Sequence, residues 1–343
     1  MRIWFDVLTP KQVMFFGRAI SILHDSGHEV LCTSRQYREA VELARIKKLK
    51  LTIVGRHGGT DRFDKLQASA ERTWKLTELV GKFEPDVAAS FSSPEASRVA
   101  FGLGTRHVGF NDSPHAEAVA RLTVPLMSRL LCPWIIPYAA WTKYGILKAR
   151  ISRYKALDAA AWIKHENPAV ESHDGKKILI RLEESKASYI ADKALDTEEM
   201  VDSLVESLSS KAEIQILCRY DDQVEAARER YGNRAEIINR VVDGVSILRN
   251  VELFVGSGGT MNAEAALLGI PTVSIAPLKI LTDDYLIKSG LVRKAKGPES
   301  LARLCKEIIS NDRIKKTQQK KARRILSLME DPTERMVSEI TSA

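Results

Sequence analysis

A glycine-rich turn followed by a carboxylate is the part of the sequence best suited to bind a charged ligand. Residues 251–275 read VELFVGSGGTMNAEAALLGIPTVSI, a pattern that predicts a strand, a tight turn, a helix and a second strand. Glycine lets the backbone approach a ligand closely, and the first turn of a helix offers N–H groups that suit a phosphate. The predicted anion site consists of Gly256, Ser257, Gly258, Gly259 and Thr260.

Glu264 is placed to recognise a sugar beside that anion site. It lies one helical turn beyond Thr260, and a carboxylate repels phosphate but accepts hydrogen bonds from hydroxyl groups, of which ribose is the natural candidate. Gly269 and Pro271 end the predicted helix. The alternative is that any tight turn between a strand and a helix prefers glycine, but the complete pattern through Pro271 is more specific than GSGGT alone.

A second group of polar residues, NDSPH at 111–115, follows another predicted strand. Asp112 and His115 are three residues apart at a predicted helix start, so the carboxylate can orient the imidazole. This arrangement is expected of a general base that takes a proton from a hydroxyl group. The alternative is that Asp112 or Ser113 caps the helix and His115 is solvated.

Two further loops complete the candidate site in the first half of the chain. Residues 55–60 (GRHGGT) form either a glycine-rich loop with a histidine at its tip or a flexible surface turn, and the sequence supports both equally. The loop after the first predicted strand, DVLTPKQ, contains no glycine, so the dinucleotide fingerprint is absent and NAD is disfavoured. The predicted acceptor or cleft-loop residues are His57, Gly58, Gly59 and Gln12.

Cationic residues in the second half of the chain could neutralise a diphosphate. Arg181 and Lys186 follow a predicted strand in RLEESKASY, and Arg219 follows the next strand, where it could approach a nucleotide base. Surface pairing of Arg219 with Asp221 and Asp222 is an equally weighted alternative. No paired carboxylates typical of a divalent-metal site stand out near these elements, so neither a metal nor a cofactor is expected.

Alternating strands and helices must position these residues. The chain of 343 residues exceeds the usual size of a single core, which predicts two domains. Strand and helix patterns alternate from Ile3 onwards, and a new series begins at Lys177 after the loose stretch KHENPAVESHDGKK. We predict an α/β protein whose two Rossmann-like halves, with parallel sheets, face one cleft. The predicted boundaries are a domain at 1–163, a linker at 164–177, a domain at 178–330 and, at 331–343, a helix that can cross back to the first domain.

The composition, 44% hydrophobic and 28% charged, is that of a soluble globular protein. The net charge of +8 suits phosphate-bearing substrates, nucleic acid or an anionic membrane, and does not choose among them. Much of the excess lies in RIKKTQQKKARR, a helical pattern typical of a solvated face, and the 6% aromatic content offers few stacking surfaces, so nucleic acid is not expected. The four scattered cysteines form no C-x-x-C pair, which favours a reducing compartment.

Two stretches of the sequence bear on membrane association. The start MRIWFDV lacks the basic region and the long apolar region of a signal peptide and is expected to be a strand. The run CPWIIPYAAWTKY is predicted as a buried strand and a loop, with a membrane-docking surface for a lipid acceptor as the alternative. We therefore expect a cytoplasmic protein, with peripheral contact at the inner face of the membrane as the alternative.

The turn, Glu264 and the LGIP ending resemble the carboxyl-terminal nucleotide-binding element of the GT-B superfamily, which includes nucleotide-sugar glycosyltransferases and non-hydrolysing UDP-N-acetylglucosamine 2-epimerases. This resemblance implies that the turn holds the diphosphate and Glu264 the ribose. The chain also resembles, nearly end to end, domain of unknown function 354, a family described as predicted GT-B glycosyltransferases. The matching pieces are FDVLTP, GHEVL, GRHGG, AFGLGT, FNDSPHA, RLTVPL, YKALD, CRYDDQ and VGSGGTMNAEAALLGIP. Members of that family usually carry histidines where this chain has Gln12 and Met14, so more of the chemistry is expected of Asp112 and His115.

Together these features predict a metal-independent glycosyltransferase that uses a nucleotide-diphosphate sugar, with a UDP-sugar favoured. Arg181 and the helix N-terminus would stabilise the leaving diphosphate, and His115 would deprotonate a hydroxyl of a sugar, lipid-linked or protein acceptor. The first alternative is a sugar-nucleotide 2-epimerase, which needs no acceptor. The second is a non-catalytic nucleotide or nucleic-acid binder, motivated by the basic charge.

Overall fold

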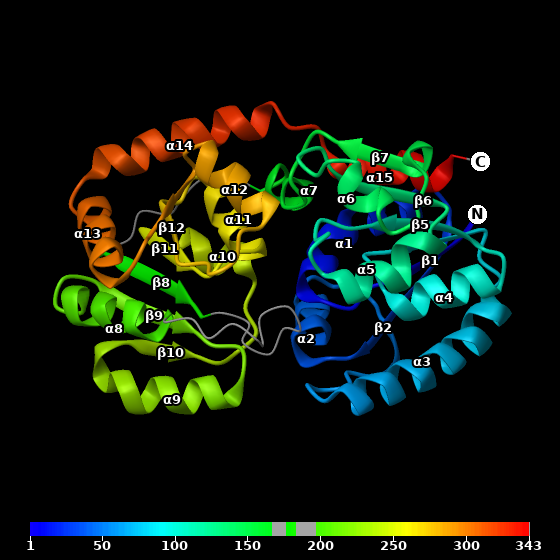
Figure 1. The fold of residues 1–343 in the computed structure, drawn as a ribbon, viewed down its shortest axis with the longest axis horizontal. Coiled ribbons are helices and arrows are strands. Elements are labelled where there is room, and N and C mark those ends of the chain that lie inside the picture. Colours follow the sequence, from blue (N-terminus) through cyan, green and yellow to red (C-terminus); the bar gives the residue numbers. More distant parts are fainter. Residues whose placement is uncertain (167–175, 183–196, 343) are drawn as a thin grey trace. The chain divides into compact units, whose positions relative to one another are not determined.

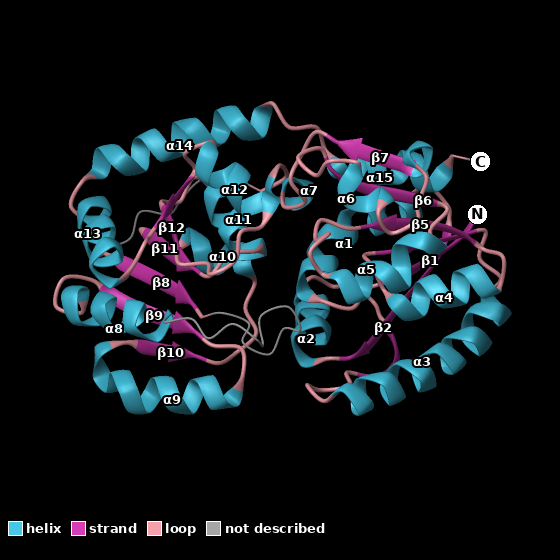
Figure 2. Cartoon of the chain, in the orientation of Figure 1, coloured by secondary structure: helices cyan, strands magenta, loops and turns pink. Residues whose placement is uncertain are grey.

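Two compact units make up the chain in the computed structural model, which describes residues 1–166, 176–182 and 197–342. Unit 1 comprises Met1–Trp162 and Glu330–Ala343, and unit 2 comprises Ile163–Met329. Residues 167–175 of the predicted linker lie outside the described residues. Each unit contains one parallel sheet with helices on both faces (Figures 1 and 2). The predicted α/β class with two Rossmann-like domains is therefore confirmed.

Unit 1 is built on a seven-stranded parallel sheet with the order β3-β2-β1-β4-β5-β6-β7. The chain starts at β1, moves outwards to β3 and then returns past β1 to β4, so the order reverses between β1 and β4. Open α/β sheets bind ligands at the carboxyl ends of strands at such a reversal. The strands are β1 (Arg2–Asp6), β2 (Glu29–Gln36), β3 (Thr52–Arg56), β4 (Val87–Ser90), β5 (Arg106–Phe110), β6 (Arg129–Pro133) and β7 (Ile151–Tyr154).

Helices α1, α2 and α15 pack together in unit 1, and α3, α4 and α5 form a second packed group. The helices are α1 (Pro10–Asp25), α2 (Arg38–Ile46), α3 (Arg62–Phe83), α4 (Pro94–Gly102), α5 (Glu117–Thr123), α6 (Ala139–Thr142), α7 (Ala160–Ile163) and α15 (Pro332–Thr341), with 3-10 turns at Val124–Leu126 and Lys148–Arg150. Helix α15 begins where Asp331 accepts a hydrogen bond from the Thr333 backbone N–H at 2.8 Å. It packs on α1 and is held by Arg106, which donates to the Glu339 carbonyl at 2.7 Å.

An aromatic cluster fixes α1 beneath the loops at the carboxyl edge of this sheet. Its rings meet edge to face, with centroids 5.3–5.5 Å apart. The rings belong to Phe5, Phe15, Phe16, Phe91 and Phe110. Because Phe91 follows β4 and Phe110 ends β5, the same cluster anchors the loops in which polar residues follow.

A buried histidine should make the stability of unit 1 depend on pH. His107 is fully buried and its Nε2 lies 2.9 Å from Ser90 Oγ. Burial lowers the pKa of His107 to about 4, so the folded state binds this proton less readily than the unfolded state, whose histidines titrate near pH 6.5. This effect is absent above pH 6.5 and destabilises unit 1 progressively as the pH falls from about 6.5 to about 4, by roughly 3 kcal/mol in total.

The measurement is urea unfolding at a series of pH values, followed by tryptophan fluorescence. All five tryptophans belong to unit 1, so the signal reports this unit. His107→Gln should flatten the decline in the free energy of unfolding between pH 6.5 and 4.5, whereas the same change at the exposed His24 should not. An unchanged pH dependence in His107→Gln would contradict the prediction.

Unit 2 is built on a six-stranded parallel sheet with the order β10-β9-β8-β11-β12-β13, which reverses between β8 and β11. The strands are β8 (Lys177–Arg181), β9 (Glu213–Leu217), β10 (Glu236–Ile238), β11 (Leu253–Gly256), β12 (Thr272–Ser274) and β13 (Val292–Lys294). The helices are α8 (Thr197–Leu208), α9 (Asp221–Tyr231), α10 (Gly244–Arg249), α11 (Thr260–Leu268), α12 (Leu281–Lys288), α13 (Pro298–Ile309) and α14 (Asp312–Ser327), with a 3-10 turn at Gly232–Arg234.

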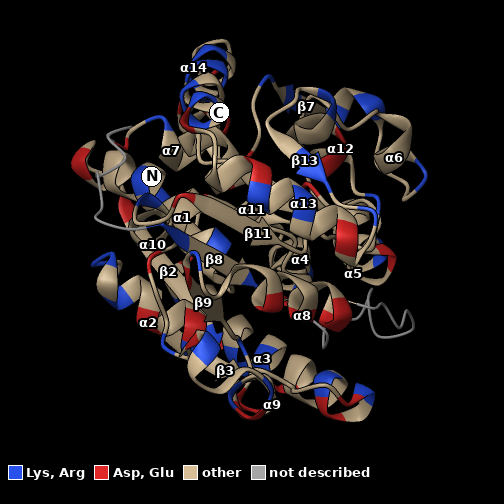
Figure 3. Cartoon of the chain, turned by 90° about the vertical axis from the view of Figure 1, so that its left-hand side faces the viewer, with Lys and Arg blue, Asp and Glu red and all other residues tan. Residues whose placement is uncertain are grey.

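The core of unit 2 lies between the sheet and helices α8, α9 and α13, where apolar residues recur at helical spacing. Helices α10, α12 and α14 each pack against α11. The basic stretch predicted to be a solvated face forms α14, along which Figure 3 colours the Lys and Arg positions blue. Most of them are exposed, as expected for a solvated face.

Two structural features relate to the predictions made from the cysteines and from the apolar stretches. The four cysteines are free and buried. Within the described parts of the chain, no helix combines the length and the apolar character needed to cross a membrane.

Candidate nucleotide-binding site and acid–base centre

The glycine-rich turn of unit 2 lies at the point where the order of the strands reverses. It leaves the carboxyl end of β11, beside β8, and leads directly into α11. Gly258 and Gly259 have φ values of +98° and +80°, a region that residues with a side chain rarely adopt. The turn therefore requires glycine at both positions, and its backbone lies where an open α/β sheet binds ligands.

Close packing around this turn leaves no room for a side chain at Gly256 or Gly258. A Cβ on Gly256 would lie 2.1 Å from Asn262 Oδ1, and a Cβ on Gly258 would lie 2.4 Å from Asp283 Oδ2. Asn262 is 1% exposed, and neither polar atom of its amide has a hydrogen-bond partner among the described residues. The turn is thus bordered by a buried amide from α11 and a buried carboxylate from α12.

Helix α11 presents its amino end at this turn. Its N-cap residue is Gly259, and no side chain of the described residues caps the helix. The N–H groups of a first helical turn and the helix dipole attract an anion. The arrangement can therefore hold a phosphate group at Gly258, Gly259 and Thr260.

Two of the predicted cationic residues, Arg181 and Arg219, lie at or just beyond the carboxyl ends of β8 and β9. Arg181 is the last residue of β8 and is the register partner of Gly256, so it lies at the level of the turn, where its Nη1 donates to the Leu217 carbonyl at 3.1 Å. Lys186 lies outside the described residues. Arg219 follows β9, and its backbone N–H donates to Gln223 Oε1 at 3.1 Å, so Gln223 serves the start of α9.

Glu264 lies in α11 and is 4% exposed. Its carboxylate points to the start of α10, because a Cβ on Gly244 would lie 2.8 Å from Glu264 Oε2. The carboxylate thus borders the VVDG loop at residues 241–244. Glu264 therefore also contacts α10, and the sequence alone does not predict that contact.

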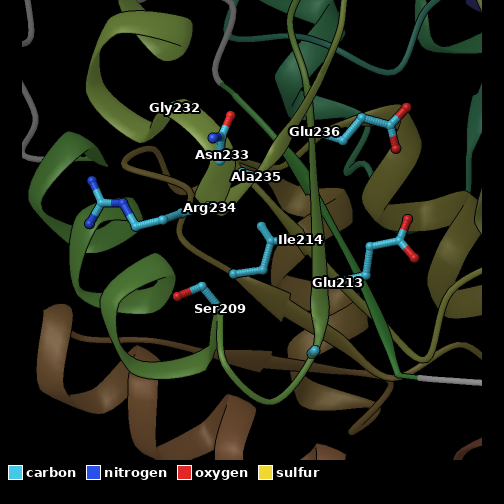
Figure 4. Close-up of a pocket in the computed structure, with 9 residues that line it drawn as sticks. Ser209, Glu213, Ile214, Gly232, Asn233, Arg234, Ala235 and Glu236 are labelled. Carbon is cyan, nitrogen blue, oxygen red and sulfur yellow. The ribbon is translucent and has the colours of Figure 1, made fainter.

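A pocket of about 410 Å³ also opens in unit 2, but at the opposite edge of the sheet (Figure 4). Glu213 and Glu236, which begin β9 and β10, lie on its wall together with Asn233 and Arg234. It therefore lies at the amino ends of the strands, away from the glycine-rich turn, and we assign it no role in nucleotide binding.

In unit 1 the structure brings Asp112 together with three residues that the sequence does not single out. Lys11 Nζ lies 2.6 Å from Asp112 Oδ2 and 2.6 Å from Asp158 Oδ2, and the Tyr154 hydroxyl donates to Asp158 Oδ1. Ser113 Oγ donates to the remaining oxygen of Asp112 at 2.8 Å. We call Lys11, Asp112, Asp158 and Tyr154 the lysine–carboxylate cluster.

The protonation of this cluster follows from its burial and its charges. Burial alone would lower the pKa of Lys11, but the two carboxylates raise it above its ordinary value. Burial favours the protonated form of Asp112, yet Lys11 outweighs it and the pKa of Asp112 is lowered. For Asp158, burial and the nearby Asp112 charge raise the pKa to about 6. Lys11 therefore remains a cation, and of the two carboxyl groups Asp158 takes up a proton first.

His115 follows Asp112 in the same loop and is exposed. Burial of part of its ring lowers its pKa, and the Asp112 carboxylate opposes this shift. The imidazole is thus neutral near pH 7, as a general base must be. Lys11 and Ser113 donate hydrogen bonds to the Asp112 oxygens, and the Asp112 charge favours protonation of His115. Helix α5 starts later, at Glu117, and neither Asp112 nor Ser113 caps it.

The other predicted loop residues of unit 1 have mainly local contacts. His57 stacks on Tyr37 with ring centroids 5.1 Å apart, and its Nδ1 accepts from the Gly59 N–H at 3.0 Å. Burial lowers the pKa of His57 to about 4. A Cβ on Gly58 would lie 2.5 Å from the Lys65 Cα, so this loop packs on the start of α3.

Gln12, predicted as a cleft-loop residue, is 6% exposed. Its Oε1 accepts from the Leu8 N–H at 2.6 Å, and its Nε2 donates to the Phe91 carbonyl at 3.2 Å. It therefore ties the loop after β1 to the loop after β4, and it has little surface left for a substrate.

A metal site is not visible in the described parts of the chain, where no group of three or more His, Cys, Asp and Glu side chains is placed to hold an ion. Asn262 and Asp283 border the glycine-rich turn, although no pattern in the sequence marks them. Asp283 follows the turn by about one α/β unit, and only the packing of α12 brings it back to Gly258.

Two parallel Rossmann-like sheets, of seven and six strands, define the GT-B fold. A presumed UDP-N-acetylglucosamine 2-epimerase from Listeria monocytogenes aligns with a TM-score of 0.79 at 14% identity, covering 99% of this chain and 96% of that one. The UDP-N-acetylglucosamine 2-epimerase from Neisseria meningitidis, solved with UDP-N-acetylglucosamine bound, aligns with a TM-score of 0.69 at 13% identity, covering 99% of both chains. The spinosyn forosaminyltransferase SpnP aligns with a TM-score of 0.67 at 13% identity, covering all of both chains.

The whole chain, residues 1–343, matches the family described as Protein of unknown function (DUF354), and it belongs to that family. An uncharacterized protein of Methanocaldococcus jannaschii, MJ0665, is 29% identical over 303 residues, covering 83% of this chain and 85% of the relative. Both resemblances stated from the sequence, to the GT-B superfamily and to this family, are confirmed.

Proposed function

We propose that the protein is a metal-independent glycosyltransferase that takes its sugar from a nucleoside diphosphate, with UDP as the favoured nucleotide. The observation that carries the proposal is the glycine-rich turn and uncapped amino end of α11 at the reversal of the unit 2 sheet. A diphosphate bound there accepts hydrogen bonds from backbone N–H groups, which stabilise the charge that grows as the sugar leaves. Arg181, at the level of the turn, supplies a compensating positive charge.

The remaining roles follow from the chemistry of the side chains. Glu264, beside the VVDG loop, accepts hydrogen bonds from the ribose hydroxyls. His115, neutral near pH 7 and exposed, takes the proton from the acceptor hydroxyl. The acceptor is a hydroxyl group of a sugar, a lipid-linked saccharide or a protein, and peripheral contact with a membrane would accompany the lipid-linked case. The proposed place of action is the cytoplasm.

A second candidate function is sugar-nucleotide 2-epimerisation. It is favoured by the TM-scores, which are higher for the epimerases above than for the glycosyltransferase, and by the several acid and base groups of the lysine–carboxylate cluster. Incubation with UDP-N-acetylglucosamine alone separates the two functions. Epimer or free UDP formed without an acceptor supports the epimerase, whereas UDP release that depends on an added acceptor supports the transferase.

Nucleotide choice is tested by thermal shift with UDP-, GDP-, CMP- and dTDP-sugars. A ligand that binds only the native state raises its stability by RT ln(1 + [L]/Kd). We expect the UDP-sugar to raise the melting temperature most. Binding of oligonucleotides that weakens steeply with salt, together with no response to any nucleotide, would instead support a nucleic-acid binder.

The ribose contact gives a prediction of its own. Glu264→Ala should weaken UDP binding by about 1.5–3 kcal/mol, or roughly 10- to 150-fold, because a charge-assisted hydrogen bond is lost. Since Glu264 is 4% exposed, this variant should also lower the melting temperature, and Glu264→Gln, which preserves the volume, isolates the loss of charge. Titration calorimetry with UDP and dUDP measures both variants. The ribose role is wrong if both variants discriminate UDP from dUDP as strongly as the native protein.

A further inference from the structure

The segment of unit 1 that contains α6 and β7 carries a positive charge that acidic residues do not balance. Residues 118–157 contain seven Lys and Arg residues and no Asp or Glu. Arg121 pairs with Glu117, and Arg129 pairs with Glu339, both acids from outside this stretch. The other five cations are exposed and form no ion pair within the described parts of the chain. We call these five residues the basic patch: Lys143, Lys148, Arg150, Arg153 and Lys155.

An aromatic ring brings cations of the basic patch together. Lys148 Nζ lies 5.1 Å from the centroid of the Tyr138 ring, and the guanidinium carbon of Arg153 lies 4.0 Å from it. Arg153 Nη1 also donates to the Trp134 carbonyl at 3.2 Å. These residues come from the loop after β6, the 3-10 turn and the edge strand β7 (Figure 1). The three elements therefore present their cations as one surface.

An apolar side chain is exposed beside these cations. Leu147, next to Lys148 in the chain, is 64% exposed. Cations beside an exposed apolar group suit the surface of an anionic bilayer, because lipid phosphates attract the cations and the acyl boundary accepts the apolar group. A nucleic acid would gain less from this surface, because the Tyr138 ring already has two cations over it and is not open to stack a base.

The basic patch is joined to the loop of His115. Tyr144, whose ring centroid lies 4.8 Å from Lys143 Nζ, donates from its hydroxyl to the Pro114 carbonyl at 2.7 Å. Tyr144 is buried, so this hydrogen bond lies in the interior of unit 1. Since Pro114 directly precedes His115, a bilayer bound at the patch would lie near the loop that is proposed to act on the acceptor.

We propose that the basic patch docks unit 1 on the surface of an anionic lipid bilayer, and that the acceptor is accordingly a lipid-linked saccharide. The second part rests on the proposed function, in which His115 takes the proton of the acceptor hydroxyl. The docking itself needs neither a nucleotide nor catalysis. Helix α14 is also basic, but none of its large apolar side chains is exposed, so it serves as a control surface.

The experiment is co-sedimentation with vesicles of two compositions, equal parts of phosphatidylglycerol and phosphatidylcholine, and phosphatidylcholine alone. The native protein should bind the anionic vesicles, with an affinity that falls as salt is added, and bind the neutral vesicles at least about tenfold more weakly. The patch variant Lys143→Glu, Lys148→Glu, Arg150→Glu should lose at least about tenfold in affinity for the anionic vesicles.

The matched control, Lys316→Glu, Lys320→Glu, Arg323→Glu, makes the same change of charge at exposed positions of α14. It should keep the affinity for anionic vesicles within about threefold, because physiological salt screens charges beyond about 8 Å. The melting temperature shows whether each variant is folded. If the patch variant fails to fold, the milder variant Lys148→Gln, Arg150→Gln replaces it and should lose at least about fivefold.

Anionic-vesicle binding that the patch variant loses and the α14 variant keeps supports the inference. No binding by the native protein, or an equal loss in both variants, overturns it. Binding of a single-stranded oligonucleotide more tightly than the vesicles, or a native dimer that dissociates in the patch variant, would assign the patch to nucleic acid or to a second copy instead. If no UDP-sugar is turned over with any acceptor, the proposed function fails, but vesicle binding still decides the docking.

Discussion

Replacing His115 with alanine should lower turnover by about two to four orders of magnitude while leaving affinity for the nucleotide-sugar donor nearly unchanged. The reason is that the donor is proposed to bind the turn of unit 2, whereas His115 belongs to unit 1 and acts on the acceptor hydroxyl. Steady-state kinetics give the turnover, and titration calorimetry gives the affinity for the donor.

Native activity should also fall as the pH decreases through the pKa of His115, because only the neutral imidazole accepts a proton. Burial places that pKa below its ordinary value, so activity should be full at neutral pH and be lost on the acid side of 6.5. His24→Ala, at a histidine that is 77% exposed, is the matched control and should behave as the native protein does. A comparable loss of donor affinity in His115→Ala would show that the role of His115 is misassigned.

Replacing Arg72 with methionine should destabilise unit 1 by about 3–5 kcal/mol, because it leaves the buried Asp6 carboxylate without the guanidinium group that binds it. Arg72 is 1% exposed, and its Nη2 and Nη1 lie 2.5 Å and 3.1 Å from the oxygens of Asp6, which is fully buried. Its Nε donates to the Val54 carbonyl at 2.9 Å, and Glu95 lies 3.6 Å away. The arginine of α3 therefore links β1, β3 and α4.

Urea unfolding followed by tryptophan fluorescence measures this loss in unit 1 alone, since the tryptophans belong to that unit. Lys75→Met, in the exposed pair with Glu71, should cost about 1 kcal/mol or less. The double variant Asp6→Asn, Arg72→Met should recover part of the stability, because it no longer buries an unpaired charge at Asp6. A double variant as unstable as the sum of the two single variants would show that the charges are not coupled.

Local patterns predicted most of the fold. The turn at 256–260, its helix and the central strands are marked by glycine, by Pro271 and by apolar runs, all of which act over a few residues. Strands β7 (ISRY) and β13 (VRK) contain no such apolar run. They are edge strands of four and three residues, and an edge strand needs fewer apolar residues than a buried central strand.

The candidate site was predicted only in part, for a physical reason. Lys11 and Asp112 are 101 residues apart, and their contact depends on the order of strands in the sheet, which no local pattern encodes. The spacing of Asp112 and His115 predicts that these two residues lie close together. It does not reveal that Lys11 donates a hydrogen bond to one of the Asp112 oxygens. The burial of Glu264 depends in the same way on α10, a distant segment that packs against α11.

The claim that the glycine-rich turn of unit 2 holds a diphosphate is tested most directly by calorimetric titration of UDP into the native protein and two glycine variants. Gly258→Val requires a side chain at φ +98° and 2.4 Å from a carboxylate oxygen, whereas Gly297→Ala, also in unit 2, places its methyl group in open space. We expect UDP to bind the native protein and Gly297→Ala with equal affinity, and uridine to bind both far more weakly. Gly258→Val should lose at least about tenfold in UDP affinity, equivalent to 1.4 kcal/mol. Equal UDP affinity in Gly258→Val, or no UDP binding by the native protein, would contradict the account.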